Sequence, residues 1–202
     1  MRHLNQRRVM NIKYKKEGDL IPHYDKHGYY YSPIGGSVGE SFAQKFFDDL
    51  SVDVGNVKSV LDLGCGNGRL SRLLKPSVHY VGVDYSSVRI DNAKNAYPQR
   101  QFHLQDLHEF VELSELDSYD LIVCIEVLEH LEDPRLLLDT IKQKKNNDAP
   151  IVGTVPIDLP YKAHLQTWKT DDEVISHLSP TLIARRKGES AMKMPHWVCK
   201  WE

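Results

Sequence analysis

The stretch VLDLGCGNG at residues 60–68 constrains the fold of this chain more than any other feature. An apolar run ends there in glycines at every second position, Gly64, Gly66 and Gly68. Glycines let a chain turn sharply off a strand, and they leave room for a ligand to touch the backbone. The loop therefore predicts a buried strand followed by a helix, with a ligand-binding site where the two meet.

Strand-like and helical segments alternate along the rest of the chain. We expect strands over residues 57–63, 80–83, 101–104, 119–125, 151–155, 182–185 and 197–201. We expect helices over residues 69–74, 86–96, 134–141 and 171–178, and we assign none to the acidic segment after residue 104. Helical crossovers join parallel strands and cover both faces of a sheet, whereas the last two strands lack such a helix and should pair antiparallel. The pattern predicts an α/β, doubly wound sheet.

A length of 202 residues favours a single domain preceded by a short extension. Residues 1–36 are polar and rich in Tyr and Gly, and we interpret them as an N-terminal arm or lid. Ser37 and Glu40 have the spacing of a capping box, so a helix is expected over residues 42–50. The domain proper is then residues 37–202.

Charge and cysteine usage exclude several classes of protein. The 26 basic and 28 acidic side chains give a net charge of −2, which provides no general attraction to nucleic acid or anionic lipid. No apolar run reaches the roughly 18–20 residues that cross a bilayer, and the amino end does not resemble a secretory signal. Cys65, Cys124 and Cys199 form no CxxC pair, which favours a reducing, cytoplasmic location.

Two acidic residues indicate the charge of the ligand. Asp84 ends the second expected strand about twenty residues after the glycine loop, where an acid accepts hydrogen bonds from both ribose hydroxyls of an adenosine. Asp62 precedes the loop, at the place where the diphosphate of a dinucleotide would lie. The glycine spacing is also GxGxG rather than GxGxxG, so a cationic ligand is favoured over NAD, such as one with a methionyl amino group and a sulfonium.

Four segments together resemble successive motifs of the class I S-adenosylmethionine-dependent methyltransferases. They are VLDLGCGNGRLSRLL, VGVDYSS, HLQDLHEF and YDLIVCIEVLEHLEDP, within residues 57–156. The resemblance implies a Rossmann-like seven-stranded sheet in the order 3-2-1-4-5-7-6, with the seventh strand antiparallel and helices on both faces. It also implies S-adenosylmethionine as the cofactor.

The same resemblance implies a role for residues at each motif. The methionine part of the cofactor would contact Asp62, Gly64, Gly66 and Gly68, and the ribose would contact Asp84. The adenine would contact Tyr85, Gln105, Asp106 and Leu107. The transferred methyl group would lie over Ile125 and Glu126. The (D/N)PP(Y/F/W) tetrapeptide of the exocyclic amino methyltransferases is replaced here by Cys-Ile-Glu-Val at 124–127. That class and the cytosine C5 enzymes, which need a Pro-Cys nucleophile, are therefore disfavoured, and we interpret Cys124 as a small core residue.

The run Glu-Val-Leu-Glu-His at 126–130 suggests how an acceptor is activated. If a helix begins there, Glu126, Glu129 and His130 share one face, and His164 after the fifth strand could reach the same edge of the sheet. This mixed donor set suits Mg, Mn, Fe or Zn, and it resembles ubiquinone-biosynthesis O-methyltransferases and small-RNA 3′-terminal ribose 2′-O-methyltransferases. The alternative is a metal-free helix start whose acids favour the helix dipole.

We therefore expect transfer of a methyl group to a hydroxyl oxygen of a small molecule or sugar. His130 is the first candidate for the base, His164 the second, and Glu126 lies beside the reacting atoms; with a metal, these residues become ligands instead. Two alternatives stay open: a metal-dependent 2′-O-methyltransferase acting on an RNA 3′ end, and a non-catalytic partner that binds S-adenosylmethionine in a larger complex. The sequence fixes neither the acceptor nor the oligomeric state.

Overall fold

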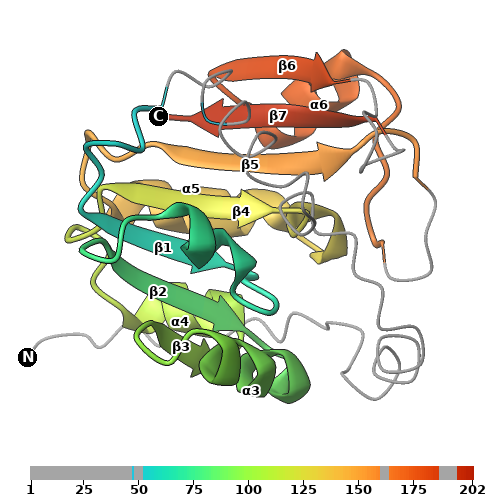
Figure 1. Cartoon of the computed structure of the whole chain (residues 1–202). Coiled ribbons are helices and arrows are strands. Elements are labelled where there is room, and N and C mark those ends of the chain that lie inside the picture. The colour runs from blue at the N-terminus through green and yellow to red at the C-terminus, as the bar shows by residue number, and fades with distance from the viewer. Residues whose placement is uncertain (1–46, 48–51, 160–163, 187–194) are drawn as a thin grey trace, which may run out of the picture.

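Seven strands form one sheet in the order β3-β2-β1-β4-β5-β7-β6 (Figure 1). The computed structural model describes residue 47 and residues 52–159, 164–186 and 195–202. The strands are β1 (Ser59–Leu63), β2 (His79–Asp84), β3 (Gln101–Leu104), β4 (Leu121–Ile125), β5 (Ile151–Pro156), β6 (Leu182–Arg186) and β7 (His196–Trp201). The order is the one implied by the resemblance, and the predicted fold class is confirmed.

The centre of the sheet is apolar on both faces because helices cover both. β1 pairs in parallel with β2 and β4, and β4 pairs in parallel with β5. All five residues of β1 except the first are buried, which explains a continuous apolar run in place of an alternating one. β7 lies antiparallel between β5 and β6, as the absence of a crossover helix predicts.

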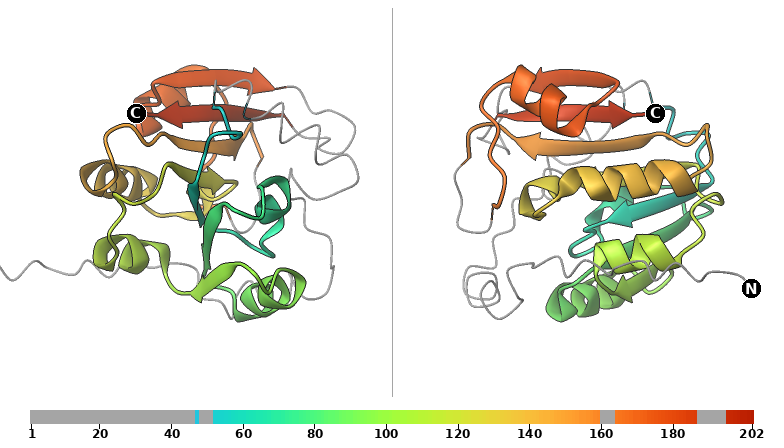
Figure 2. Two further views of the ribbon diagram at one scale, coloured as in Figure 1. Left: turned by 60° about the vertical axis from the view of Figure 1, so that its left-hand side comes forward. Right: turned by 180° about the vertical axis from the view of Figure 1, so that it is seen from behind.

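The helices form one layer on each side of the sheet. They are η1 (Arg69–Leu73), α3 (Ser87–Ala96), α4 (Leu107–Leu113), η2 (Leu128–His130), α5 (Pro134–Lys144) and α6 (Asp171–Leu178). The view from behind shows α4, α5 and α6 on one face, whereas η1 and α3 cover the other (Figure 2). Two hydrophobic clusters match these layers, one containing Phe110 and Leu137 and the other Leu70 and Ile90.

One local expectation differs from the structure, and two lie almost wholly outside the described residues. The helical segment expected after β1 is present as a 3-10 helix, η1. The acidic segment after β3 contains a helix, α4, that the sequence analysis missed because only two turns carry its buried residues. The helix expected over residues 42–50 lies outside the described residues except for Phe47, which is helical and buried, and the arm at 1–36 lies outside them entirely.

Among the described residues, no helix combines the length and the apolar character needed to cross a bilayer. Cys65, Cys124 and Cys199 are free thiols, all buried. Cys124 has no exposed surface within β4, in agreement with its interpretation as a core residue.

Candidate active site

The glycine loop leaves β1 with three residues in the left-handed region. Gly64, Gly66 and Gly68 have φ values of 74°, 54° and 71°, which other residues adopt only with strain. A Cβ on Gly64 would lie 2.3 Å from a methyl carbon of Val127, so the loop packs directly on the segment that follows β4. A Cβ on Gly66 would meet no described atom within 4 Å. Gly66 is therefore the point where a ligand can approach the backbone.

Asp84 ties this loop to the end of β2. Its carboxylate is buried, and it accepts a hydrogen bond from the Gly66 N–H at Oδ2 and one from the Ser86 N–H at Oδ1, both 2.9 Å long. The Arg89 guanidinium lies 3.8 Å from the same carboxylate. The acid predicted to bind ribose thus stands beside the open glycine, where it also orders the loop.

Asp62 lies under the loop in a far less polar setting. Only 4% of it is exposed, and Oδ2 accepts a 2.6 Å hydrogen bond from the phenol of Tyr80 on β2. Burial raises the pKa of Asp62 to about 7; the Tyr80 hydrogen bond opposes this rise, and the nearby charge of Asp84 adds to it. A cationic ligand would favour the ionised carboxylate.

The residues predicted for the adenine lie at the ends of β2 and β3. Tyr85 follows Asp84 and is 39% exposed, whereas Leu107 is buried. The Gln105 N–H donates to the Asp84 carbonyl, which joins the two strand ends. Asp106 caps α4, with Oδ1 accepting from two backbone N–H groups at the start of that helix. One oxygen of Asp106 is thus already engaged, a structural role that the sequence analysis did not assign.

The Glu-Val-Leu-Glu-His run does not form the helical face that was expected. Glu126 has a φ of 52°, and only Leu128–His130 are helical, as the 3-10 turn η2. The expectation of an α-helix beginning at Glu126 was wrong, because the chain turns sharply as it leaves β4. The Glu126 N–H donates to both the carbonyl and the hydroxyl oxygen of Thr154, which fixes this turn against β5.

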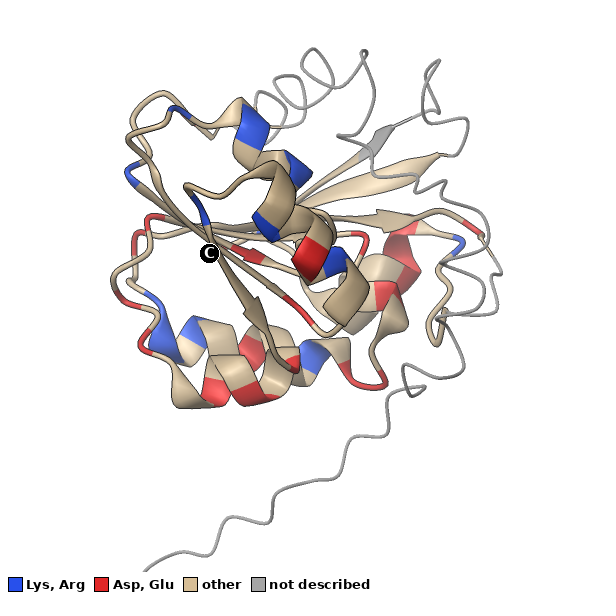
Figure 3. Ribbon diagram, turned by 60° about the horizontal axis from the view of Figure 1, so that its bottom comes forward, with Lys and Arg blue, Asp and Glu red and all other residues tan. Residues whose placement is uncertain are grey.

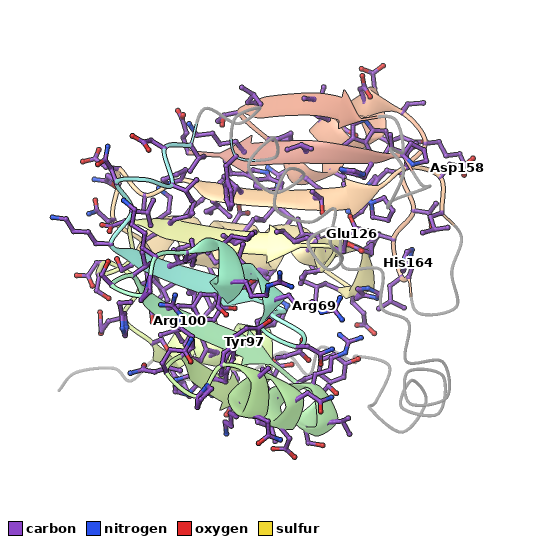
Figure 4. The ribbon with its side chains drawn as sticks, viewed as in Figure 1. Arg69, Tyr97, Arg100, Glu126, Asp158 and His164 are labelled. Carbon is purple, nitrogen blue, oxygen red and sulfur yellow. The ribbon has the colours of Figure 1, made fainter. Side chains whose placement is uncertain are left out.

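The turn nevertheless brings three of the four predicted metal ligands together. Ligand atoms of Glu129, His130 and His164 all lie within 4.8 Å of one another; among the described residues, Glu126 is outside this group. The two imidazole rings meet edge to face, with centroids 4.9 Å apart, and Glu129 Oε1 is 3.7 Å from His130 Nε2. Figure 4 shows Glu126 and His164 at the end of the sheet toward which β4 and β5 run.

Hydrogen bonds made by the two residues after His164 hold it in this position. The N–H groups of Leu165 and Gln166 both donate to the Glu129 carbonyl, over 2.7 and 3.0 Å. The side-chain nitrogen of Gln166, Nε2, donates to the backbone carbonyls of Leu131 and Glu132, each 3.0 Å away. We name these four hydrogen bonds the β5–η2 tie, because they join the segment after β5 to η2.

The chemistry of the cluster fits a divalent cation. Both carboxylate oxygens of Glu129 and one of Glu126 are buried without a hydrogen-bond partner within the described part of the chain. Burial raises the pKa of Glu129, and the neighbouring Glu126 raises it further. His164 Nδ1 lies 2.9 Å from the Leu159 carbonyl, which can only accept a hydrogen bond, so Nδ1 carries the proton of the neutral ring. Such a bond orients most metal-binding histidines, and burial lowers the pKa of His164, which keeps the ring neutral.

Comparison with known proteins decides the family. A family profile described as "Methyltransferase domain" matches residues 39–186. The chain belongs to this methyltransferase family. The expected membership in the S-adenosylmethionine-dependent methyltransferases is thereby confirmed.

Curated relatives of this methyltransferase align over its central part. The ubiquinone biosynthesis O-methyltransferase of Coxiella burnetii is 40% identical over 84 residues, which cover 40% of this chain and 36% of the relative. The mitochondrial protein of the same name from Schizosaccharomyces pombe is 36% identical over 104 residues, covering 48% and 38%. The chain thus matches less than two fifths of the length of these relatives.

A solved structure agrees with the fold. The N-methyltransferase NodS from Bradyrhizobium japonicum, in complex with S-adenosyl-L-homocysteine, superposes with a TM-score of 0.63 at 20% identity. The superposition covers 84% of this methyltransferase and 89% of NodS. At that identity, the likeness speaks for the fold and not for the acceptor.

Four residues that shape the site were not among those predicted from the methyltransferase sequence. They are Asn67, whose Oδ1 is buried without a described partner; Tyr80, which binds Asp62; Thr154, which holds Glu126; and Gln166, which anchors the β5–η2 tie. Asn67 could have been found from its place between two loop glycines. The other three make contacts with residues 18 to 35 positions away in sequence, where no local motif signals the contact.

Proposed function

We propose that this protein transfers the methyl group of S-adenosylmethionine to a hydroxyl oxygen of a small molecule or sugar. One observation carries the proposal: the group formed by Glu129, His130 and His164 stands at the same sheet edge as the open glycine loop. The close packing of Gly64 on Val127 supports their proximity, since Val127 lies within the Glu-Val-Leu-Glu-His run. Donor and acceptor would thus meet over the end of β4.

The donor half of the site suits a cationic nucleoside. In this proposal, Asp84 and the backbone at Gly66 receive the ribose, and Asp62 faces the positive methionyl part. Because a sulfonium is already an activated donor, holding it in line with the acceptor supplies most of the rate, on the order of 7–11 kcal/mol.

The acceptor half suits a group that must lose a proton. His130 is the proposed base, and His164 is the second candidate; a positioned base contributes roughly 10²–10⁴ in rate. Glu129, His130 and His164 would hold a divalent ion, with Glu126 adding negative charge beside them. When bound, such an ion lowers the pKa of an acceptor hydroxyl. Either version of the site favours an oxygen acceptor.

The class of acceptor is inferred from charge and from the relatives. In Figure 3, α3 and α5 carry charges of both signs, whereas α4 and α6 carry only acidic ones. This distribution favours a small or neutral acceptor over a polyanion. The relatives with 36–40% identity are O-methyltransferases by name, which supports an oxygen acceptor. His164, the second histidine of the cluster, supports RNA as the alternative acceptor. The free thiols are compatible with the proposed cytoplasmic location.

The test is turnover of methyl-labelled donor with three acceptor sets: hydroxylated aromatic compounds, sugars and short RNA. Each set is assayed with Mg²⁺, with Mn²⁺ and with EDTA. The proposal expects labelled ether products from the first or second set, and loss of activity in Glu129→Gln and His130→Ala. Labelling of RNA alone would establish the alternative acceptor, and donor binding without any turnover would indicate a non-catalytic partner.

A further inference from the structure

The pair formed by Tyr80 and Asp62 places two polar side chains in the core of the sheet. Tyr80 is 2% exposed and Asp62 4%, and their hydrogen bond spans 2.6 Å. Burying a hydroxyl and a carboxylate is unfavourable even when they bond to each other, and apolar residues of similar size are often equally stable. The pair is therefore a candidate for a functional role.

The sheet register places Tyr80 where its phenol reaches Asp62. Val60 pairs with Tyr80, and Asp62 pairs with Gly82 two residues further along the same parallel strands. Since side chains two residues apart share a face, Tyr80 and Asp62 point to the same side of the sheet. Gly82 contributes no side chain between them; a Cβ there would lie 2.8 Å from the Cys65 sulfur and 2.9 Å from the Phe102 ring.

The Tyr80 ring is itself held from two directions. Phe102 packs against it edge to face, with ring centroids 5.7 Å apart. The Arg100 guanidinium lies 6.0 Å from the ring centroid, and it donates to backbone carbonyls around the end of η1, including those of Leu74 and Val78. Figure 4 shows Arg100 alongside β2, away from the strand ends that carry Glu126 and His164. The phenol oxygen therefore has one well-defined position.

We propose that Tyr80 is a positioning residue for the donor: it orients the Asp62 carboxylate and keeps it ionised so that it can receive the cationic methionyl part. The inference rests on the proposed function, because it takes S-adenosylmethionine as the ligand. Within the described part of the chain, the Tyr80 hydrogen bond goes to Oδ2, so Oδ1 keeps its lone pairs for a ligand.

The charges around Asp62 explain why its carboxylate needs a hydrogen-bond donor such as the Tyr80 phenol. Asp84 lies close enough to repel the ionised Asp62 carboxylate, and Arg89 pairs with Asp84 at 3.8 Å. The thiols of Cys65 and Cys124 are near enough to interact electrostatically with Asp62, and both are neutral because burial raises their pKa values. The phenol of Tyr80 is neutral as well, since burial raises its pKa. Tyr80 is thus the group that stabilises the ionised carboxylate before a cation arrives.

The test compares S-adenosylmethionine affinity from pH 5.5 to 8.5 by calorimetry in wild type, Tyr80→Phe and Tyr119→Phe. Tyr119 is a matched control: a buried tyrosine that packs against His79 at the opposite end of the strands. Wild type should lose affinity as the pH falls through about 7 and Asp62 gains a proton. A hydrogen bond to a charged group is worth enough to move that midpoint upward by roughly one unit in Tyr80→Phe.

At pH 6 we therefore expect Tyr80→Phe to bind about tenfold more weakly than wild type, with convergence at pH 8.5. The Tyr119→Phe profile should coincide with that of wild type. The affinity of Asp62→Asn should lack the midpoint near pH 7, and adding Tyr80→Phe to Asp62→Asn should not change the affinity further. Titration of the ligand's own amino group is common to all variants and cancels in the comparison.

Three results would separate the failures. If wild type binds the donor but Tyr80→Phe follows the same pH profile, the positioning role is refuted and the proposed function stands. A uniform loss of affinity at every pH, with a lowered Tm, would show Tyr80 to be merely structural. If wild type binds no S-adenosylmethionine at any pH, the proposed function itself fails.

Discussion

At the scale of single residues, two buried carboxylates beside the glycine loop are satisfied in different ways. Among the described residues, Asp84 has two backbone N–H donors and a guanidinium nearby, whereas Asp62 has one phenol. A ribose that binds Asp84 would share the carboxylate with the Gly66 N–H, so donor binding and loop order would be coupled. A bound cation would give the Asp62 carboxylate a second partner.

Glu129 is a third buried carboxylate, and its lack of described hydrogen-bond partners leads to a prediction about stability. Its two carboxylate oxygens are buried and accept no hydrogen bond from any described residue, and a buried polar group left without a partner is destabilising. Mn²⁺ at 100 times its dissociation constant should stabilise the wild type by about 2.7 kcal/mol, or a rise in Tm of roughly 5–10 °C. We expect Glu129→Gln to abolish this rise, measured by differential scanning fluorimetry.

Glu132→Gln is the matched control for that experiment, because Glu132 is an exposed acid two residues after η2. Its Tm should rise with Mn²⁺ as in the wild type. An equal rise in Glu129→Gln would place the ion elsewhere and remove the metal from the proposed site.

At the scale of elements, α4 begins at a residue for which two roles compete. Asp106 caps this helix, and it is also the acid that the family resemblance places at the adenine. Replacing Asp106 by Ser keeps a capping oxygen, whereas Ala removes it at a cost of about 1 kcal/mol. We expect both variants to weaken donor affinity several-fold, and Ala alone to lower the unfolding free energy measured in urea. Equal donor affinity in Ser and wild type would restrict Asp106 to capping.

The β5–η2 tie is the second element on which the site depends. Gln166→Ala removes two hydrogen bonds from it and loosens His164 against His130. Because groups that orient metal ligands typically affect affinity by 10–100-fold, we expect Mn²⁺ to bind about tenfold more weakly while donor affinity is unchanged. Gln143→Ala, an exposed change on α5, is the control. Parallel losses of metal and donor affinity would show that the tie supports the whole fold and not the metal site alone.

These elements also show how far the sequence alone could reach. Every strand was predicted, and β1, β4 and β5 were the clearest because a sheet covered on both faces needs continuous apolar segments at its centre. The short helices were less accessible: α4 has only two turns, and η1 and η2 are 3-10 turns whose geometry depends on what they pack against. Glu126 was expected in a helix because its left-handed φ leaves no trace in the sequence when the residue is not glycine.

At the scale of the whole molecule, the two halves of the site meet because parallel strands end at one edge of the sheet. The residues proposed to bind the donor lie on β1 and β2, and those proposed as metal ligands follow β4 and β5, on either side of the β1–β4 pairing. Sequence reasoning predicted both halves from motifs, since each motif follows one strand. It could not predict Tyr80 or Gln166, because their contacts arise from register and from loop packing.

Burying negative charge at this edge makes the stability of the whole domain depend on pH. The pKa of Asp62 is raised from 3.8 to about 7 in the folded chain, so folding favours the protonated acid. Its contribution to stability is full below about pH 4 and is lost progressively as the pH rises through 7, a change on the order of a few kcal/mol. Glu126 contributes with the same sign, because burial raises its pKa too.

We therefore expect Asp62→Asn to raise the unfolding free energy relative to wild type by clearly more at pH 8 than at pH 5, measured by urea denaturation in the absence of donor. Saturating S-adenosylmethionine should narrow the difference at pH 8, since the cation stabilises the wild-type carboxylate and not the amide. The matched control is Asp91→Asn on the exposed face of α3, whose difference from wild type should be the same at both pH values. If the difference in unfolding free energy between wild type and Asp62→Asn stays constant from pH 5 to pH 8, Asp62 titrates as an ordinary carboxylate. It is then ionised throughout this range, and the affinity for the donor gains nothing from a group that keeps it ionised.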